Sequence, residues 1–401
     1  MKKLIALLLA AMMVFGMAAC GASEGGAADK ASDLKVGFIF LHDENSTYDK
    51  NFIDAAVEAC KTMGVTMVQK TQIPESNACY EAAVELIEVE ECDIIFADSF
   101  GHESFLMQAA KEYPNVQFCH ATGTQAHTAT ELKNFHNAFA SIYQGRYAAG
   151  VVAGLKLNEM IDAGKITAEQ AKMGYVGAFT FAEVMSGYTS FYLGAKSVCP
   201  SVTMDVKFTG SWYDETKEKQ AAEALIAGGC VLISQHADSM GAPTACENAG
   251  VPNVSYNGST AAACPETFLI SSRINWVPYF EYMITQVKDG AAIDVDWTGT
   301  LETGSVALTE LGKNVAEGTQ KKLDEVVKGL KDGTINVFDT ANFTVGGNTL
   351  TSYMADVDTD PDFAKDTEVI TDGIFYESKY RSGPYFDVEI DGITLLDRNY
   401  G

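Results

Sequence analysis

Short runs of apolar residues alternate along this chain with longer segments in which apolar residues recur every three or four positions. "KVGFIFL" at 35–41 and "CDIIFA" at 92–97 are typical of buried strands, whereas "YEAAVELIEV" at 80–89 has helical spacing. Strands that alternate with amphipathic helices form parallel sheets with helices on both faces. The pattern therefore predicts an α/β fold built on doubly wound parallel sheets.

The same order of elements occurs twice. The first copy contains "KVGFIFL", "GVTMVQ", "NACYEAAVELIEVEECDIIFADS" and "QAAKEYPNVQFCHATG", and the second contains "GYVGAF", "SVTMDVKF", "KEKQAAEALIAGGCVLISQHADS" and "PTACENAGVPNVSYNGS". The matching positions are Val36-Gly37 with Val176-Gly177 (offset 140), Val65-Thr66-Met67 with Val202-Thr203-Met204 (137), Cys92 with Cys230 (138), and Pro114-Asn115-Val116 with Pro252-Asn253-Val254 (138). This repeat predicts two similar lobes that are joined by a hinge near residues 135–150.

The length of the chain agrees with two lobes, because about 380 residues after the first twenty suit two domains. We expect the first lobe to contain 34–140 plus about 260–295, and the second to contain 141–259 plus about 296–340. Residues 341–401 have no continuous apolar pattern, so we expect short strands that decorate a lobe. Within them, "DGITLLDRNYG" is typical of a terminal hairpin that turns at Asp391-Gly392.

The first twenty residues have the features of a secretory signal: Lys2 and Lys3, then the apolar "LIALLLAAMMVF", then "GMAAC". The ending Met17-Ala18-Ala19-Cys20 resembles a bacterial lipobox, whose cysteine carries the lipid anchor of the mature chain. An ordinary signal peptide with a chance cysteine is the alternative. Residues 21–33, rich in Gly, Ala and Ser, are typical of a flexible tether. No other apolar run reaches about 18 residues, so we expect the remainder outside the cytoplasm, held at the cell membrane.

The chain is strongly acidic. Its 28 Lys and Arg against 54 Asp and Glu give a net charge of −26, and removal of Lys2 and Lys3 with the signal changes this to 26 − 54 = −28. Such a surface repels phosphate backbones and anionic lipid, which argues against nucleic-acid binding. The eight cysteines after Cys20 stand singly without a CxxC pair, and apolar residues surround Cys60, Cys92, Cys119, Cys199 and Cys230. We therefore expect buried free thiols.

Ligands of open α/β sheets bind beyond the carboxyl ends of the strands, and in a two-lobed protein these ends face one cleft. Each predicted strand is followed there by aromatic, acidic or amide residues. The candidate ligand-binding residues are His42, Asp43, Tyr48, Asp49, Asp98, Ser99, Phe100, Phe179, Phe181, Trp212, His236, Asp238, Tyr256 and Asn257. Rings bury a planar ligand face and polar groups read its edge, so these residues permit either a purine-like ring or a sugar.

Some of these residues also have purely structural interpretations. Asp98 follows a strand and suits a helix cap, and Trp212 suits the roof of the second lobe's core. For Arg146, in "YQGRYAAGVVAGL", we expect a structural ion pair rather than a ligand contact.

Catalysis and metal binding are disfavoured. His120, His127 and His136 lie in a strand end, a loop and a following strand, and nothing brings them together as zinc ligands. His42 beside Asp43 resembles an acid/base pair, but the chain has no GxSxG, Walker or GxGxxG motif. We therefore expect no enzyme, no metal and no cofactor.

Several longer motifs resemble the basic membrane protein (BMP) family of substrate-binding lipoproteins of ABC transporters, related to purine-nucleoside receptors. The motifs are "YDKNF" at 48–52, "AAKEYPNVQFCHATG" at 109–123, "YQGRYAAGVVAG" at 143–154, "GYVGAFTFAEVMSGYTSFYLGAKSVCPSV" at 174–202, "WYDETKEKQAAEALIAGGCVLISQHADS" at 212–239 and "INWVPYFEYMI" at 274–284. The resemblance covers residues 34 to about 330.

The resemblance implies a type I periplasmic-binding-protein fold that captures a purine nucleoside or nucleobase for import through an ABC permease. It places Tyr48, Asp49, Asp98 and Phe100 in the binding loops of the first lobe. In the second lobe it places Phe179, Trp212, His236 and Asp238.

One position departs from the family pattern. Asn45-Ser46 stand where related sequences have Gly-Trp, so a stacking surface is missing. Three alternatives therefore remain: another planar ligand such as a flavin, a sugar ligand, and a sensor that signals to a membrane partner.

Overall fold

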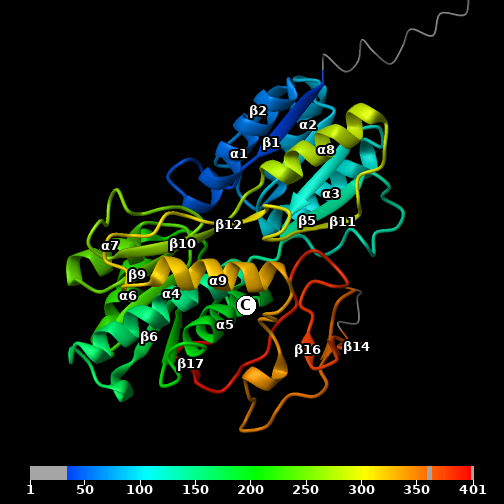
Figure 1. Ribbon diagram of the computed structural model, residues 1–401. Helices are drawn as coiled ribbons and strands as arrows, with labels where there is room; N and C mark the ends of the chain where they lie inside the picture. Colours follow the sequence, from blue (N-terminus) through cyan, green and yellow to red (C-terminus); the bar gives the residue numbers. More distant parts are fainter. Residues whose placement is uncertain (1–33, 359–363, 399–401) are drawn as a thin grey trace, which may run out of the picture. The chain divides into compact units, whose positions relative to one another are not determined.

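The computed structural model describes residues 34–358 and 364–398. The expected signal peptide, Cys20 and the tether lie outside the described residues. The described chain forms two parallel sheets, each covered by helices on both faces (Figure 1). This confirms the predicted fold class of two doubly wound lobes.

The first lobe contains a sheet of order β11-β5-β4-β3-β1-β2, in which all neighbours are parallel. Its strands are β1 (Lys35–Ile39), β2 (Thr66–Lys70), β3 (Ile94–Ala97), β4 (Gln117–Ala121), β5 (Phe135–Ala140) and β11 (Asp296–Gly299). Its helices are α1 (Thr47–Met63), α2 (Asn77–Glu88), the short 3₁₀ helix η2 (Phe100–His102), α3 (Glu103–Glu112) and α8 (Val277–Asp289).

The second lobe contains a sheet of order β12-β10-β9-β8-β6-β7-β17, in which only β12 runs antiparallel. Its strands are β6 (Lys172–Gly177), β7 (Thr203–Phe208), β8 (Leu232–His236), β9 (Asn253–Tyr256), β10 (Phe268–Ile274), β12 (Val306–Leu308) and β17 (Ile393–Leu395). Its helices are α4 (Tyr143–Asp162), η3 (Ala168–Gln170), α5 (Ala182–Lys196), α6 (Glu215–Ala227), α7 (Gly241–Ala249) and α9 (Thr319–Lys331).

Alternating side chains of each strand enter different cores, as expected for a sheet that is buried on both faces. In β1, Val36 and Phe38 pack with α1 and α8, whereas Ile39 joins the core formed with α2 and α3. Local signals in the sequence set the helix ends. The Ser46 hydroxyl accepts from the Asp49 N–H at the start of α1, and Gly64, in the left-handed conformation (φ 63°), ends that helix.

The predicted duplication is confirmed by the identical order β5-β4-β3-β1-β2 and β10-β9-β8-β6-β7. The pairing with the neighbouring strands makes Gly37 and Gly174 equivalent. A Cβ on Gly37 would lie 3.0 Å from Leu86 Cδ1 of α2, and one on Gly174 would lie 3.1 Å from Leu225 Cβ of α6, so both glycines allow the same close helix–strand packing.

Two of the four predicted offsets are wrong. The match of Val36-Gly37 with Val176-Gly177 is displaced by three residues, because Lys35-Val36-Gly37 occupies the register of Lys172-Met173-Gly174. The Pro-Asn-Val match is displaced as well, because strand pairing aligns Thr122 with Asn257 at the ends of β4 and β9. Both of these residues adopt the left-handed conformation, with φ of 64° and 63°. The letters Val-Gly and Pro-Asn-Val occur in both copies but three residues out of the structural register, so matching identical letters gave the wrong offsets.

The chain passes from one lobe to the other after β5, between β10 and α8, and between β11 and β12. The first passage follows Ala140, the last residue of β5. Residues 260–295, expected in the first lobe, are divided: β10 pairs with β9 in the second sheet, whereas α8 packs on α1 in the first lobe. Residues 296–299, expected in the second lobe, pair with β5 as β11.

The C-terminal segment, which we define as residues 341–398, contains two small antiparallel pairs, β13 (Met354–Ala355) with β14 (Thr367–Glu368) and β15 (Ile370–Thr371) with β16 (Ile374–Phe375). The 3₁₀ helix η4 (Thr340–Asn342) precedes them. The expected terminal hairpin is absent from the described residues, because β17 instead pairs in parallel with the outer edge of β7. Phe386 stacks on Phe338 at 4.3 Å between ring centroids.

The eight cysteines in the described part of the chain are all buried free thiols, as expected. Among the described residues, no helix combines the length and the apolar character that a membrane span requires.

Candidate functional site

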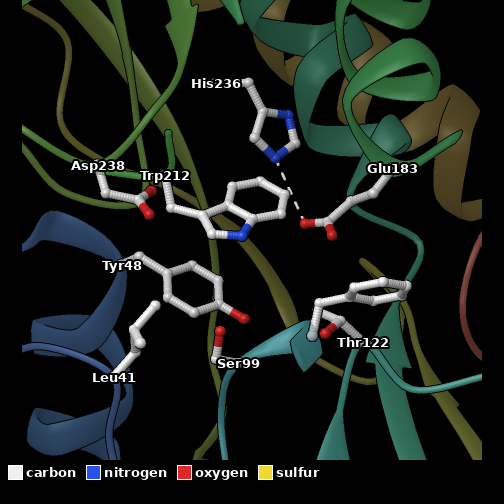
Figure 2. Close-up of a pocket in the computed structure, with 9 residues that line it drawn as sticks. Leu41, Tyr48, Ser99, Thr122, Glu183, Trp212, His236 and Asp238 are labelled. Atoms are coloured by element: carbon white, nitrogen blue, oxygen red, sulfur yellow. Dashed lines mark hydrogen bonds and ion pairs between the residues drawn. The ribbon is translucent and has the colours of Figure 1, made fainter. Parts of the chain in front are cut away.

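A pocket lies between the two lobes, at the carboxyl ends of strands from both sheets (Figure 2). It encloses about 330 Å³ of empty space, a figure that includes its open mouth. We call it the ligand pocket, and it is lined by Leu41, Tyr48, Ser99, Phe100, Thr122, Glu183, Trp212, His236 and Asp238. Six of these are predicted site residues: Tyr48, Ser99, Phe100, Trp212, His236 and Asp238.

Tyr48 forms the first lobe's aromatic wall of the ligand pocket. It projects from the first turn of α1, and its ring packs on Phe52 at 4.8 Å between centroids. Its hydroxyl donates to the backbone carbonyl of Asp98 at 2.7 Å. Burial raises the pKa of Tyr48 well above its usual range, so the phenol stays neutral. The ring is therefore held in a fixed position at the pocket.

Asp98 does not line the ligand pocket, although the sequence places it among the candidate ligands. Its side chain is fully buried, and its Oδ1 accepts from the Leu41 N–H at 3.1 Å. It does not cap the following helix, because Ser99 is the N-cap residue of η2. Burial, and then the nearby Asp49 carboxylate, raise the pKa of Asp98 well above its usual range. Asp98 therefore fixes the loop after β1 as a neutral carboxyl group.

Asp49 is also turned away from the ligand pocket. Its carboxylate accepts from the His42 N–H at 2.6 Å and from the Ser46 hydroxyl at 2.6 Å. Burial by itself raises the pKa of Asp49, but the bonds from His42 and Ser46 outweigh burial and lower it. The loop 42–49 is thus closed around a buried carboxylate. His42 and Asp43 line a neighbouring hollow with Gln72 and Tyr213 rather than the ligand pocket.

The second lobe contributes a stack of rings behind Trp212. Phe179 lies 5.1 Å from Phe181 and 5.0 Å from Trp212 between centroids. Of these three predicted residues, only Trp212 lines the ligand pocket, and Phe179 supports it from behind. Phe181 contacts Phe100 of the first lobe at 5.4 Å. Figure 2 shows the indole of Trp212 between Tyr48 and His236.

His236 and Glu183 form the polar pair of the second lobe. His236 Nε2 lies 3.3 Å from Glu183 Oε1, and burial lowers the pKa of His236 despite this contact. The interaction of neutral imidazole with the carboxylate is drawn in Figure 2. Glu183 is not among the residues predicted from the sequence. An acidic residue in the first turn of a helix such as α5 is common for electrostatic reasons, so it carried no separate signal.

Asp238 lies across the pocket from this pair and is buried. Burial, then the Asp49 carboxylate, raise the pKa of Asp238 well above its usual range, so it holds a proton. The predicted residues Tyr256 and Asn257 are buried behind the lining, with Tyr256 4.4 Å below the His236 ring. The Tyr256 hydroxyl and the Asn257 amide nitrogen have no hydrogen-bond partner within residues 34–358 and 364–398.

The expected ion pair of Arg146 is absent from the described structure. Its guanidinium donates to the Tyr175 hydroxyl at 2.9 Å and to the Ser234 hydroxyl at 2.8 Å. It also lies over the rings of Tyr175, Phe191 and Tyr256 at 5.1–5.3 Å from the centroids. Hydroxyls and ring faces replace a carboxylate here, and they hold Tyr256 beneath His236.

Direct contacts between the lobes surround the ligand pocket. The Thr47 N–H, at the start of α1, donates to the backbone carbonyl of Asp238 at 2.9 Å, and the Thr47 hydroxyl reaches the same oxygen at 3.2 Å. The His42 and Tyr213 rings lie 5.4 Å apart. The lobes therefore meet at the edge of the site where a ligand would join them.

The histidines that could suggest a metal have separate partners. His120 contacts the Ser99 carbonyl at 2.7 Å, His127 the Val357 carbonyl at 3.0 Å, and His136 the Gln117 side chain at 3.0 Å. Within the part of the chain that the structure describes, no three His, Cys, Asp or Glu side chains gather as metal ligands.

Two parallel α/β lobes, linked by three passages of the chain, enclose an aromatic and polar pocket, which is a two-lobed fold suited to holding a small ligand. A structural comparison finds the same fold in another protein. A solute-binding protein of an ABC transporter from Aeropyrum pernix K1 has a TM-score of 0.63 and 17% sequence identity, covering 79% of this chain and 94% of that one.

The sequence comparisons identify the family. Residues 36–340 match the family described as ABC transporter substrate-binding protein PnrA-like, and the chain belongs to this Bmp family. A purine-binding protein of Brucella abortus is 31% identical over 323 residues, which cover 78% of this chain and 85% of the relative. A relative from Haloferax volcanii, whose name proposes glucose binding for it, is 30% identical over 254 residues, covering 63% of this chain and 61% of its own length.

The resemblance inferred from the motifs is thereby confirmed. The chain is a substrate-binding protein of an ABC transporter rather than an enzyme. Such proteins bind a small molecule on the outer side of the membrane and interact with a membrane permease.

Proposed function

We propose that this protein captures a purine nucleoside or purine base in the ligand pocket and delivers it to an ABC permease for import. One observation carries the proposal: aromatic rings of opposite lobes, Tyr48 and Trp212, line the same small pocket beside the buried Asp238 and the half-buried Glu183. The purine-binding relative from Brucella abortus supports the same ligand class.

The rings would hold the faces of a purine. Stacking of a base on an aromatic side chain contributes about 1–3 kcal/mol in nucleic-acid binders. Asn45-Ser46 stand where related sequences have Gly-Trp, so Trp212 is the indole that lines the pocket and could stack on the base. Tyr48 approaches from the other lobe, so stacking would be complete only with both lobes in place. This is how a ligand favours the closed arrangement.

The polar groups would read the edge of the ring. A protonated Asp238 has both an O–H donor and an acceptor, and a neutral His236 has one donor and one acceptor. The Glu183 carboxylate is an acceptor, and Ser99 and Thr122 also line the ligand pocket. This mixture suits the alternating donors and acceptors of a purine edge. A buried polar group left without a partner costs about 1–3 kcal/mol, which would discriminate between bases.

A sugar is the second candidate, because the relative from Haloferax volcanii bears a name that proposes glucose binding. A sugar would use the same rings through its C–H face and the same acids through its hydroxyls. The two candidates differ in one respect: a base needs a flat aromatic slot, whereas a pyranose needs more hydrogen-bond partners around its whole rim.

A thermal-shift screen followed by titration calorimetry tests the proposal. The panel contains adenine, guanine, hypoxanthine, their nucleosides, riboflavin and glucose. A purine compound at a hundred times its dissociation constant should stabilise the protein by about 2.7 kcal/mol, and glucose should not. Stabilisation by glucose or riboflavin, with none by any purine, would contradict the proposal.

We also propose that the mature chain is held at the outer face of the cell membrane by a lipid on Cys20. The lipobox-like ending Met17-Ala18-Ala19-Cys20 and the following tether support this proposal. An anchored receptor stays close to its permease, which raises the local concentration of loaded receptor.

A further inference from the structure

A second hollow adjoins the ligand pocket and shares Phe100, Thr122 and Glu183 with it. We call it the side pocket. It encloses about 700 Å³ of empty space, including its open mouth, and Phe181 lies on the same side as Phe100. The two pockets therefore adjoin at these three residues, so a group attached to a ligand in the ligand pocket would lie next to the side pocket.

The outer wall of the side pocket comes from the C-terminal segment, through Asp356, Arg381, Gly383 and Pro384. The family match ends at residue 340, so this wall lies outside the part of the chain that the family model describes. The side pocket is thus built jointly by the strand ends of the two lobes and by a segment that the family model does not cover.

Hydrogen bonds fix this wall to the first lobe. The backbone N–H and the hydroxyl of Ser382 donate to Asp296 Oδ1 at 2.8 and 2.7 Å. The Val357 carbonyl contacts His127 Nε2 at 3.0 Å. Gly383 lies against the loop after β4, where an added Cβ would be only 2.9 Å from the Gly123 carbonyl oxygen. The close approach requires glycine there, so the wall has a defined position rather than resting loosely over the site.

Arg381 positions the wall and is not itself a free anion-binding group. Its guanidinium donates to the carbonyls of Gly383, Val357 and Pro384 at 3.2–3.4 Å. These three hydrogen bonds join the stretch of chain at Asp356-Val357 to the stretch at Gly383-Pro384. The Arg381 guanidinium therefore bonds to backbone carbonyls of the C-terminal segment itself.

The groups that remain facing the side pocket are mainly acceptors. Asp356 Oδ1 is buried and has no hydrogen-bond partner among the described residues, and the Glu183 carboxylate borders the same space. The Thr122 hydroxyl already donates to the Ala121 carbonyl, which leaves its oxygen as an acceptor. Acceptors beside the Phe100 and Phe181 rings suit a group with hydroxyl donors and an apolar face. The Asp356 carboxylate offsets the charge of Arg381 in the same wall, and Glu183 adds a further negative charge, so the balance disfavours a phosphate.

Building on the purine function proposed above, we infer that the side pocket is a second subsite. In it, Asp356 and Glu183 accept hydrogen bonds from the hydroxyls of a neutral pentose attached to the base. The C-terminal segment thereby makes this protein selective for nucleosides over free bases and over nucleotides.

Titration calorimetry on the full mature chain tests this inference with adenine, adenosine and adenosine 5′-monophosphate, and with the corresponding guanine series. The nucleoside of the better series should bind about tenfold more tightly than its base, and the monophosphate should bind more weakly than the nucleoside. Asp356→Asn, which is nearly the same size, should weaken nucleoside binding about five- to tenfold and leave base binding within about twofold. Asp372→Asn, an exposed position in the same segment, is the matched control and should change neither.

Two results would overturn the inference alone: a base that binds as tightly as its nucleoside, or an Asp356→Asn variant that loses base and nucleoside affinity equally. In both cases purine binding itself stands. If neither bases nor nucleosides bind the unaltered protein, the proposed function fails and the inference falls with it. Circular dichroism melting of each variant shows whether an affinity loss comes from unfolding.

Discussion

Trp212 has a different environment from the other two tryptophans. Trp276 is buried among Phe52, Phe96 and Phe280, and Trp297 packs against Tyr279, whereas Trp212 faces the ligand pocket. Phe179 holds the indole from behind at 5.0 Å. The core therefore orients Trp212, but its outer face is left to a ligand.

Trp212→Ala should weaken the binding of a planar ligand about tenfold or more, because a stacking contact of roughly 1–3 kcal/mol is lost. Calorimetric titration measures the change. Trp212→Phe keeps an aromatic face and serves as the control, so its loss should be clearly smaller. Equal affinities for the Ala variant and the unaltered protein would show that Trp212 is only part of the second lobe's core.

Glu377 is a buried carboxyl group outside the ligand pocket. Burial raises its pKa to about 8, and one of its oxygens has no hydrogen-bond partner within the described chain. The folded protein thus keeps a proton that the unfolded chain loses near the usual glutamate pKa. Because the native state then binds more protons, this group makes the free energy of unfolding fall as pH rises from about 4.5 to about 8.

Glu377→Gln should remove that share of the pH dependence. We expect the free energy of unfolding of the variant, relative to that of the unaltered protein, to rise by about 2 kcal/mol or more between pH 5 and pH 8. Urea unfolding at both pH values measures it. Glu317→Gln, at an exposed position, should leave the pH dependence unchanged. Parallel curves for Glu377→Gln and the unaltered protein would exclude a proton held at Glu377.

At the scale of elements, α4 and α5 form the tightest helix contact of the second lobe. A Cβ on Gly150 of α4 would lie 2.0 Å from the Phe191 carbonyl oxygen, and one on Gly194 of α5 would lie 2.0 Å from the Tyr147 carbonyl oxygen. The two backbones touch where each helix has glycine. This contact places α4, which follows the first passage between the lobes, directly against the lobe's core.

Gly150→Ala should lower the free energy of unfolding by about 3 kcal/mol or more, because the helices must move apart and lose packing. Gly258→Ala is the matched control, since nothing lies within 4 Å of an added Cβ there and its φ is not positive. Chemical denaturation of both variants gives the comparison. A loss below about 1 kcal/mol for Gly150→Ala would show that the contact relaxes easily.

The elements themselves were largely predictable, but their partners were less so. The apolar periodicity predicted the helices and strands of both copies and hence the two sheets. It did not predict that β10 pairs in the second sheet while β11 returns to the first, because neither segment carries a local signal for a particular sheet edge. The same applies to β17, whose pairing with β7 depends on an open sheet edge rather than on a turn.

Prediction of the site was similarly uneven. Tyr48, Trp212, His236 and Asp238 follow strands and line the pocket, as the rule for α/β sheets implies. Asp49 and Asp98 follow strands as well, but the backbone N–H groups of nearby loops turn their carboxylates inward. Residue type and position in the sequence do not distinguish these outcomes, because the choice depends on which donors the folded loop presents.

At the scale of the whole molecule, the two lobes share one pocket and contact each other at its rim, through Thr47 with Asp238 and through His42 with Tyr213. The C-terminal segment contacts both lobes, through Ser382 with Asp296 of the first and through β17 with β7 of the second. Movement of one lobe relative to the other must therefore bend this segment or break its bonds.

Cys20→Ala should release the protein from the membrane, because the lipid that we propose would have no attachment atom. Phase separation in Triton X-114 of cells and medium measures this: the unaltered protein should enter the detergent phase and the variant the aqueous phase. A Cys60→Ala variant, altered at a buried cysteine, is the control and should stay with the detergent. Equal partition of Cys20→Ala and the unaltered protein would exclude the anchor.

The sequence by itself determined the repeat, the α/β class, the family and the set of strand ends at which a ligand site lies, since all of these depend on local periodicity and on motifs. Only the tertiary structure decided which side chains at those ends face the pocket, that Glu183 joins them, and that residues 356–384 build a neighbouring wall. The physical reason is that these outcomes depend on hydrogen bonds and packing between segments far apart in the chain, such as Ser382 with Asp296. No local pattern encodes such pairings.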